Sequence, residues 1–227
     1  MVTIGIDEAG RGPILGPMVM AAVALRPPRA GALTRAGVCD SKAFGAGPDA
    51  HAARSALVPR ILEAAEAVAL VVVDVAEVDR AACRGGLNRL EQRHADVLLG
   101  RLPPADRVIA DGKNLFSPLR ARWPQLRAVD EAEQAHVAVA AASILAKVRR
   151  DELWWCIERR YQPEFGPVEG MGYVNPATKR FLRRFIERHR ALPPEGRRSW
   201  PWHFARDLLP PDFNVLGDVP DEQLALW

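Results

Sequence analysis

The chain has 227 residues, of which 48% are hydrophobic and 26% are charged, and its formal net charge is +3. This composition is ordinary for a globular protein, and the length suits one domain of moderate size, alone or with a smaller appendage. No run of 18 or more apolar residues occurs, which excludes a transmembrane helix. The N-terminus shows no secretory signal and the three cysteines show no paired spacing, so we expect a cytoplasmic protein without a membrane partner.

The first two thirds of the chain alternate strand and helix patterns. Five apolar runs predict β-strands, at residues 1–7, 17–25, 69–78, 106–113 and 126–134. Helical spacing of apolar residues predicts helices at 51–67, 79–102 and 136–161, the second of them weakened by Gly85-Gly86. Residues 26–50 are rich in Gly and Pro and predict a loop.

The predicted sheet is mixed. The first three strands arrive with only one helix among them, which is typical of an antiparallel start. The later strands alternate with helices, which favours parallel pairing. The pattern therefore predicts an α/β fold.

The residues beyond 162 differ from the rest. A turn-rich stretch precedes residues 177–192, where an apolar stripe opposite arginines predicts an amphipathic helix. Between Pro176 and Trp200, eight Lys or Arg residues stand against two Glu. Such a basic segment indicates an anionic partner such as nucleic acid, and a solvated helix face is the alternative.

Acidic residues end two of the predicted strands. Asp7 and Glu8 close the first strand ahead of Gly10-Arg11-Gly12-Pro13, and Asp111 closes a later one. If these strands are neighbours, the carboxylates meet at one edge of the sheet, where oxygen ligands without His or Cys favour Mg²⁺ or Mn²⁺. A further acid can come from residues 130–133. The alternative is that these residues only form turns and helix caps.

Five segments resemble the motifs of the ribonuclease HII family, and they occur in the family's order. They are Gly5-Ile6-Asp7-Glu8-Ala9-Gly10-Arg11-Gly12-Pro13, Asp40-Ser41-Lys42, Ile109-Ala110-Asp111-Gly112, Ala140-Ala141-Ala142-Ser143-Ile144-Leu145-Ala146-Lys147-Val148 with Arg150-Asp151, and Gly172-Tyr173. The resemblance extends over roughly residues 2–200.

The resemblance implies a ribonuclease H-like mixed five-stranded sheet flanked by helices, with a catalytic domain at 1–161 and a helical substrate-binding extension at 162–227. It implies an endonuclease that cuts the RNA strand of RNA/DNA hybrids. It also implies cutting on the 5′ side of single ribonucleotides in duplex DNA, which leaves 5′-phosphate and 3′-hydroxyl ends and serves DNA replication and repair.

The resemblance also implies the metal ligands. Asp7, Glu8 and Asp111 correspond to the family's ligands of Mg²⁺ or Mn²⁺. The family's fourth catalytic acid lies 18 residues before Asp151, which places it at Glu133, where the family usually has Asp. Asp130 is the alternative fourth acid.

Substrate contacts are implied in the same way. Backbone groups of Gly10, Arg11 and Gly12 would contact the 2′-hydroxyl of the ribonucleotide, and glycine suits this role because a Cβ would hold the backbone away from the sugar. Tyr173, rather than Met171, would stack on that sugar. The implied phosphate contacts are Lys42, Ser143 and Lys147, for which exposed lysines and a small packing serine are the alternatives.

Two other functions stay open. A ribonuclease HIII-like enzyme would cut hybrids but handle single ribonucleotides poorly, and the absence of an additional N-terminal domain before the first strand argues against it. A catalytically silent nucleic-acid-binding relative would result if Glu133 could not complete the site. We expect a monomer that binds RNA/DNA hybrids and ribonucleotide-containing duplex DNA.

Overall fold

The computed structural model describes residues 1–210 and 213, which form two compact units made of separate chain segments. The first, which we call the sheet unit, consists of Met1–Ala9, Val19–Val72 and Asn88–Arg150. The second unit consists of Gly10–Met18, Val73–Leu87 and the described residues from Asp151 onward. The division into a catalytic domain at 1–161 and a substrate-binding extension at 162–227 stays a prediction.

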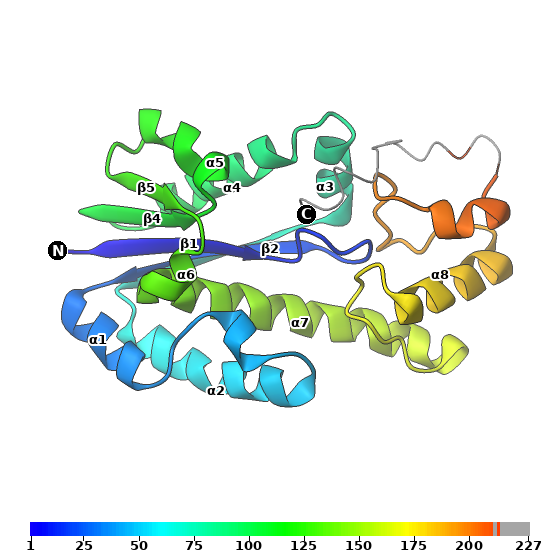
Figure 1. The fold of residues 1–227 in the computed structure, drawn as a ribbon, viewed down its shortest axis with the longest axis horizontal. Helices are drawn as coiled ribbons and strands as arrows, with labels where there is room; N and C mark the ends of the chain where they lie inside the picture. The colour runs from blue at the N-terminus through cyan, green and yellow to red at the C-terminus, as the bar shows by residue number, and fades with distance from the viewer. Residues whose placement is uncertain (211–212, 214–227) are drawn as a thin grey trace. The chain divides into compact units, whose positions relative to one another are not determined.

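A five-stranded sheet forms the centre of the sheet unit, with the strand order β3-β2-β1-β4-β5 (Figure 1). The strands are β1 (Thr3–Ala9), β2 (Met18–Leu25), β3 (Ala67–Val73), β4 (Arg107–Asp111) and β5 (Leu126–Val129). Strand β1 pairs with β2 antiparallel and with β4 parallel, and β4 pairs with β5 parallel. The predicted mixed sheet is therefore confirmed.

Helices flank this sheet. They are α1 (Pro27–Arg35), α2 (Pro48–Ala64), α4 (Leu87–Arg101), α5 (Lys113–Phe116), α6 (Ala132–Ala135) and the first part of α7 (Val137–Phe165), with 3₁₀ turns η1 (Ser41–Phe44) and η2 (Ser117–Ala121). In Figure 1, α1, α2 and α7 lie on one side of the sheet, and α4 and α5 lie on the other. None of the helices formed by the described residues is long and apolar enough to cross a membrane.

Helix α7 lies directly against β1 because Gly5 has no side chain. A Cβ built on Gly5 would fall 2.1 Å from the backbone carbon of Ala138. The alanines at the start of α7, from 138 to 142, are buried and allow the helix backbone to come this close. The acidic end of β1 and the N-terminal half of α7 are thus held in a fixed relation.

The second unit has its own apolar core. This unit contains α3 (Val75–Ala82), α8 (Pro176–His189), the 3₁₀ turn η3 (His203–Leu208) and the end of α7. Four members of the stripe predicted for α8 are buried, namely Phe181, Leu182, Phe185 and Ile186, whereas the fifth, His189, is exposed. The ring of Phe181 lies 5.2 Å from that of Tyr161 on α7.

Four predicted elements were wrong in part. The strand expected at 126–134 ends at Val129, and Ala132–Ala135 forms α6 instead. Residues 26–50 were expected to be a loop, but they contain α1, where Pro27 and Pro28 occupy the first helical positions, in which a missing N–H is tolerated. The strand expected at 69–78 ends at Val73, because Asp74 caps α3 by accepting a 2.7 Å hydrogen bond from the Glu77 N–H. The helix expected at 79–102 is divided into α3 and α4.

Candidate active site

The acids Asp7 and Asp111 lie on neighbouring parallel strands. Ile6 pairs with Ala110 in the β1–β4 register, so the residues that follow them, Asp7 and Asp111, reach the same edge of the sheet. Side chains of paired residues in a parallel sheet share a face. Asp7 is only 6% exposed, whereas Asp111 is half-buried. The two strands are therefore neighbours, and their terminal acids lie at the same end of the sheet, as expected.

The surroundings of Asp7 disfavour its negative charge. Burial raises the pKa of its carboxyl group well above the ordinary 3.8, and the charges of Glu8 and Asp111 raise it further. A hydrogen bond with the Ser143 hydroxyl and a 2.8 Å bond from the Glu8 N–H act in the opposite direction without cancelling the rise. A cation beside Asp7 would relieve this repulsion.

Asp111 shares this unfavourable environment. Burial raises the pKa of its carboxyl group, and the nearby Glu133 raises it as well. The Ala132 N–H, at 2.9 Å from Oδ1, and the charge of Lys42 lower it only in part. Three carboxylates from β1, β4 and α6 thus act on one another in a partly buried region.

Glu133 is held in this region by α6 and by Lys42. Its side chain is buried, and Lys42 Nζ lies 3.1 Å from Oε1. Partial burial lowers the pKa of Lys42, but the hydrogen bond and the charge of Glu133 outweigh that effect and raise it. The alternative acid, Asp130, is exposed and accepts a 2.7 Å hydrogen bond from the Lys113 N–H, which is the role of a turn residue.

A buried network fixes the loop that carries Lys42. The Ser41 and Ser143 hydroxyls lie 2.8 Å apart, which ties the loop to α7. Arg54 on α2 is buried, and its Nη1 donates 3.1 Å hydrogen bonds to the carbonyls of Ser41 and Gly45. Sequence reasoning missed Arg54. The available signal was an arginine three residues before Leu57 on the buried stripe of a helix.

Lys147 lies one helical turn beyond Ser143 on α7. It is half-buried, and the spacing of four residues places both on one face of the helix. All four predicted acids, Lys42, Ser143 and Lys147 therefore belong to the sheet unit.

The remaining predicted residues come together in the second unit. The Gly172 carbonyl accepts hydrogen bonds from the N–H groups of Ile14 (2.8 Å) and Leu15 (3.2 Å), which ties the tyrosine turn to the segment after Gly10-Arg11-Gly12. The Gly172 backbone has φ 77°, and a Cβ there would fall 2.6 Å from the Leu15 carbonyl oxygen. A Cβ on Gly12 would lie 3.7 Å from the ring of Tyr173, which is 48% exposed and so is not a core aromatic.

The chemistry of the acids fits a hard divalent cation. No three Asp, Glu, His or Cys side chains within residues 1–210 are grouped so that they could hold a metal ion by themselves. Mg²⁺ commonly needs only one or two carboxylates, because water and substrate phosphates complete its coordination. Asp7 and Asp111 supply two carboxylates, and the buried Oε2 of Glu133 has no hydrogen-bond partner among the residues that the structure describes. Mg²⁺ and Mn²⁺ both suit this all-oxygen set.

Comparison with known proteins agrees with this architecture. The family model for ribonuclease HII matches residues 4–202. Ribonuclease HII of Thermococcus sibiricus is 33% identical over 206 residues, which cover 86% of this chain and 87% of the relative. The crystal structure of ribonuclease H2 from Pyrococcus horikoshii matches with a TM-score of 0.76 at 29% identity, over 92% of this chain and 97% of that one.

A more distant solved structure has the same fold. Bst-RNase HIII in complex with Mn²⁺ matches with a TM-score of 0.64 at 23% identity, over 83% of this chain and 63% of that one. The match of the family model over most of the chain and the identity to curated relatives decide the assignment. The chain belongs to the ribonuclease HII family.

Proposed function

We propose that this ribonuclease H enzyme cuts the RNA strand of RNA/DNA hybrids and nicks duplex DNA on the 5′ side of single ribonucleotides, using Mg²⁺ or Mn²⁺. The observation that supports the proposal most is the placement of Asp7 and Asp111 at the ends of adjacent parallel strands, where burial and neighbouring carboxylates raise the pKa of both carboxyl groups. Perturbed acids of this kind cluster at catalytic sites.

Asp7, Glu8 and Asp111 are the proposed metal ligands. Bound Mg²⁺ or Mn²⁺ would stabilise negative charge on the scissile phosphate and promote ionisation of a water molecule. Glu133 is the proposed fourth acid, because it is buried beside Asp111, whereas Asp130 is engaged by the Lys113 backbone. Lys42 neutralises Glu133 through the 3.1 Å ion pair and remains largely exposed, so its ammonium group can also meet a phosphate.

Ser143 and Lys147 are proposed to contact the substrate backbone from one face of α7. The Ser143 hydroxyl is shared between Ser41 and Asp7, so it also orients the Asp7 carboxylate. Lys147 supplies the positive charge one turn further along the helix.

Gly10, Arg11, Gly12 and Tyr173 are proposed to recognise the ribonucleotide. The backbone of the glycine loop carries no bulky side chain at Gly10 or Gly12, and the exposed ring of Tyr173 lies beside Gly12. Such an arrangement can admit one sugar and test it for a 2′-hydroxyl, the group that distinguishes RNA from DNA.

Glu133 discriminates this proposal from that of a catalytically silent relative. We expect Glu133→Ala to lose most of the cleavage rate, because the variant removes the acid beside Asp111 and leaves Lys42 without its partner. Glu133→Asp keeps the charge and restores the acid usual in the family, so it should retain activity within about tenfold of wild type. A wild-type protein that binds hybrids but cuts none with either ion would support the silent relative.

Three duplexes of equal length test the proposed specificity. One carries a single ribonucleotide, one carries a continuous RNA strand, and one is all DNA. Each is labelled at the 5′ end and incubated with and without Mg²⁺ or Mn²⁺. The proposal expects cutting of the first two only, and only with the ion. Cutting of the continuous RNA strand alone would favour the ribonuclease HIII-like alternative.

A further inference from the structure

The carbonyl groups of the glycine loop are all bonded to one distant segment of the chain. Arg197 donates through Nη2 to the Gly10 carbonyl (2.5 Å) and through Nη1 to the Arg11 carbonyl (2.6 Å). The indole N–H of Trp200 donates to the Gly12 carbonyl at 2.9 Å. Three successive carbonyls are therefore bonded by two side chains that lie more than 180 residues away in sequence.

Arg197 is suited to this role by its shape and its burial. Its side chain is fully buried, and Nε makes a third bond of 2.9 Å to the Gly16 carbonyl. The Trp200 ring covers the guanidinium group, with 4.7 Å between the guanidinium carbon and the ring centroid. A guanidinium group presents several donors in a fixed plane, whereas a lysine ammonium group could replace only part of this set.

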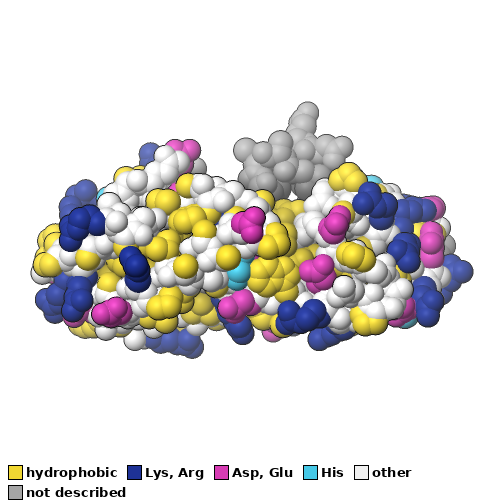
Figure 2. Space-filling model, turned by 90° about the horizontal axis from the view of Figure 1, so that it is seen from below, with side chains coloured by type: hydrophobic (Ala, Val, Ile, Leu, Met, Phe, Trp, Pro, Cys, Tyr) yellow, Lys and Arg dark blue, Asp and Glu magenta, His cyan; other side chains and the backbone are white. Residues whose placement is uncertain are grey.

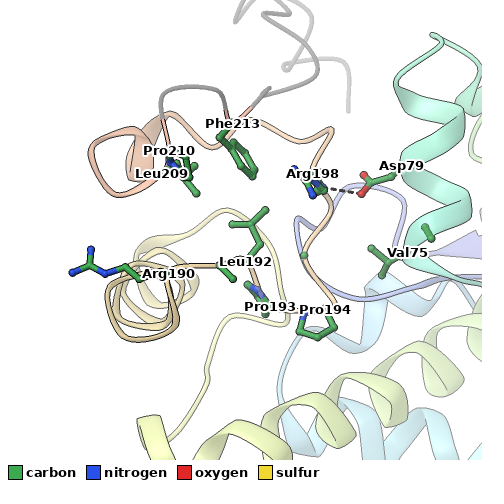
Figure 3. A pocket seen from close by; sticks show the side chains of 13 residues that line it. Val75, Asp79, Arg190, Leu192, Pro193, Pro194, Arg198, Leu209, Pro210 and Phe213 are labelled. Carbon is green, nitrogen blue, oxygen red and sulfur yellow. Dashed lines mark hydrogen bonds between the residues drawn. The ribbon is translucent and has the colours of Figure 1, made fainter.

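The backbone around Arg197 is anchored on two sides. Leu15 and Gly196 form a β-bridge, and the Arg197 N–H donates to the Ile14 carbonyl at 2.8 Å. On the other side, Asp79 of α3 accepts bonds from the N–H groups of Arg198 (2.8 Å) and Ser199 (3.1 Å). Figure 3 shows Asp79 pointing from α3 towards Arg198. All of these residues belong to the second unit.

Fixed carbonyls also fix the direction of the neighbouring N–H groups. In a trans peptide group, the N–H points away from the C=O. The carbonyls of Gly10 and Arg11 point to Arg197, so the N–H groups of Arg11 and Gly12 point to the opposite side of the loop. The third peptide group, whose carbonyl is bonded by Trp200, leads into Pro13 and has no N–H to offer.

We propose that Arg197 and Trp200 are positioning residues that hold the Gly10–Gly12 loop so that its N–H groups face the 2′-oxygen of the bound ribonucleotide, and that they thereby set the preference for ribonucleotides. The inference rests on the proposed role of the loop. Neither side chain needs to touch the substrate, because their effect reaches it through the loop backbone.

The binding preference of inactive protein tests this role. In an Asp7→Asn background, the dissociation constants of an all-DNA duplex and of the same duplex with one ribonucleotide are measured by fluorescence anisotropy in Mg²⁺. Their ratio is independent of the fraction of folded protein, so a merely structural defect leaves it unchanged. Trp200→Phe keeps an aromatic ring over Arg197 and removes the indole N–H, and we expect it to reduce the ratio about fivefold. Arg197→Lys keeps the charge and loses the planar set of donors, and we expect its ratio to approach one.

The matched control is Trp123→Phe. This change also removes a single indole N–H bond, the 2.8 Å bond to Asp96 in the sheet unit, and it should leave the ratio unchanged. Unchanged ratios in both Trp200→Phe and Arg197→Lys, or an equal fall in Trp123→Phe, would overturn the inference. A ratio of one in the Asp7→Asn parent would instead overturn the proposed recognition of ribonucleotides by the loop.

Discussion

At the scale of single residues, Asp7 shows a conflict between stability and its proposed role as a metal ligand. Its carboxylate is buried beside Glu8 and Asp111, and its raised pKa means that the folded protein binds a proton there more readily than the unfolded chain does. The contribution of this group to stability is therefore most favourable at low pH, and it is lost as the pH rises above the ordinary 3.8. Without a metal ion, Asp7 is a destabilising residue at neutral pH.

Removing this charge should stabilise the metal-free protein. We expect Asp7→Asn to raise the unfolding midpoint in EDTA at pH 7 by about 2–4 °C, the shift that corresponds to about 1 kcal/mol in a chain of this size. The gain should shrink at pH 4, where the wild-type carboxyl group binds a proton. Differential scanning calorimetry at both pH values measures this, and a lower midpoint for Asp7→Asn at pH 7 would contradict the electrostatic account of the site.

Residue-level reasoning from the sequence located the acids but missed two buried arginines that hold nearby loops, Arg54 at the Lys42 loop and Arg197 at the Gly10–Gly12 loop. Asp7 and Asp111 could be found because acids that directly follow apolar strands are conspicuous in any sequence. Arg54 and Arg197 could not be found in this way. Their hydrogen bonds go to backbone carbonyls, which every residue has, so the residue types of the partner segment do not reveal the contact. For Arg197, the partner carbonyls are more than 180 residues away.

At the scale of elements, the contact between β1 and α7 positions Asp7, the first acid of the candidate site. Gly5 lies two residues before Asp7 on the face that α7 covers, so a larger residue there would separate the strand from the helix. The distance of 2.1 Å from a Cβ to the Ala138 backbone cannot be relieved by rotation of a side chain. The sheet and α7 would have to move apart.

We expect Gly5→Ala to destabilise the protein by about 3 kcal/mol or more, at the upper end for overpacked cores. Gly100→Ala is the matched control: Gly100 lies in α4 with open space around its Cβ position, so alanine should stabilise the helix by up to about 1 kcal/mol. Urea denaturation of both variants measures the difference. Equal free energies of unfolding for Gly5→Ala and Gly100→Ala would show that α7 is not packed on β1 as described.

The elements that the sequence could predict are those with an unambiguous pattern. Strands β1 and β2 are apolar runs next to Gly and Pro turns, and α8 has a clear apolar stripe, so their patterns are unambiguous. Helix α1 was missed because its two prolines are typical of loops as well as of helix starts, and only Leu33 in it is buried. The end of β3 was missed because the β-branched residues continue past Asp74, so the cap signal was hidden in a strand-like run.

At the scale of the whole molecule, the basic charges are less available than their number suggests. Figure 2 shows many Lys and Arg side chains on the surface formed by the second unit, with Asp and Glu among them. Arg183 pairs with Asp207 at 2.7 Å, and Arg184 donates to the Phe165 carbonyl at 2.9 Å. Arg180 is exposed on α8, and its side chain has no ion pair or hydrogen bond with any residue that the structure describes.

Arg180 is therefore the residue of α8 best placed to meet a phosphate. We expect Arg180→Gln to weaken duplex binding to a similar degree for all sequences and to reduce the slope of log affinity against log salt by about one. Arg183→Gln is the matched control, because its charge is already neutralised by Asp207, and its slope should stay close to that of wild type. Binding titrations at several salt concentrations distinguish the two, and equal slopes for Arg180→Gln and wild type would remove α8 from the nucleic-acid interface.

The most direct test of the whole account compares two Asp→Asn variants on the duplex with a single ribonucleotide. Asp7 is a proposed metal ligand, whereas Asp130 is an exposed turn residue that accepts a hydrogen bond from the Lys113 backbone. In Mg²⁺, the account predicts that Asp7→Asn lowers the initial cleavage rate by about a thousandfold or more, while Asp130→Asn stays within a few-fold of wild type. A wild-type rate for Asp7→Asn, or an equal loss in Asp130→Asn, would contradict it.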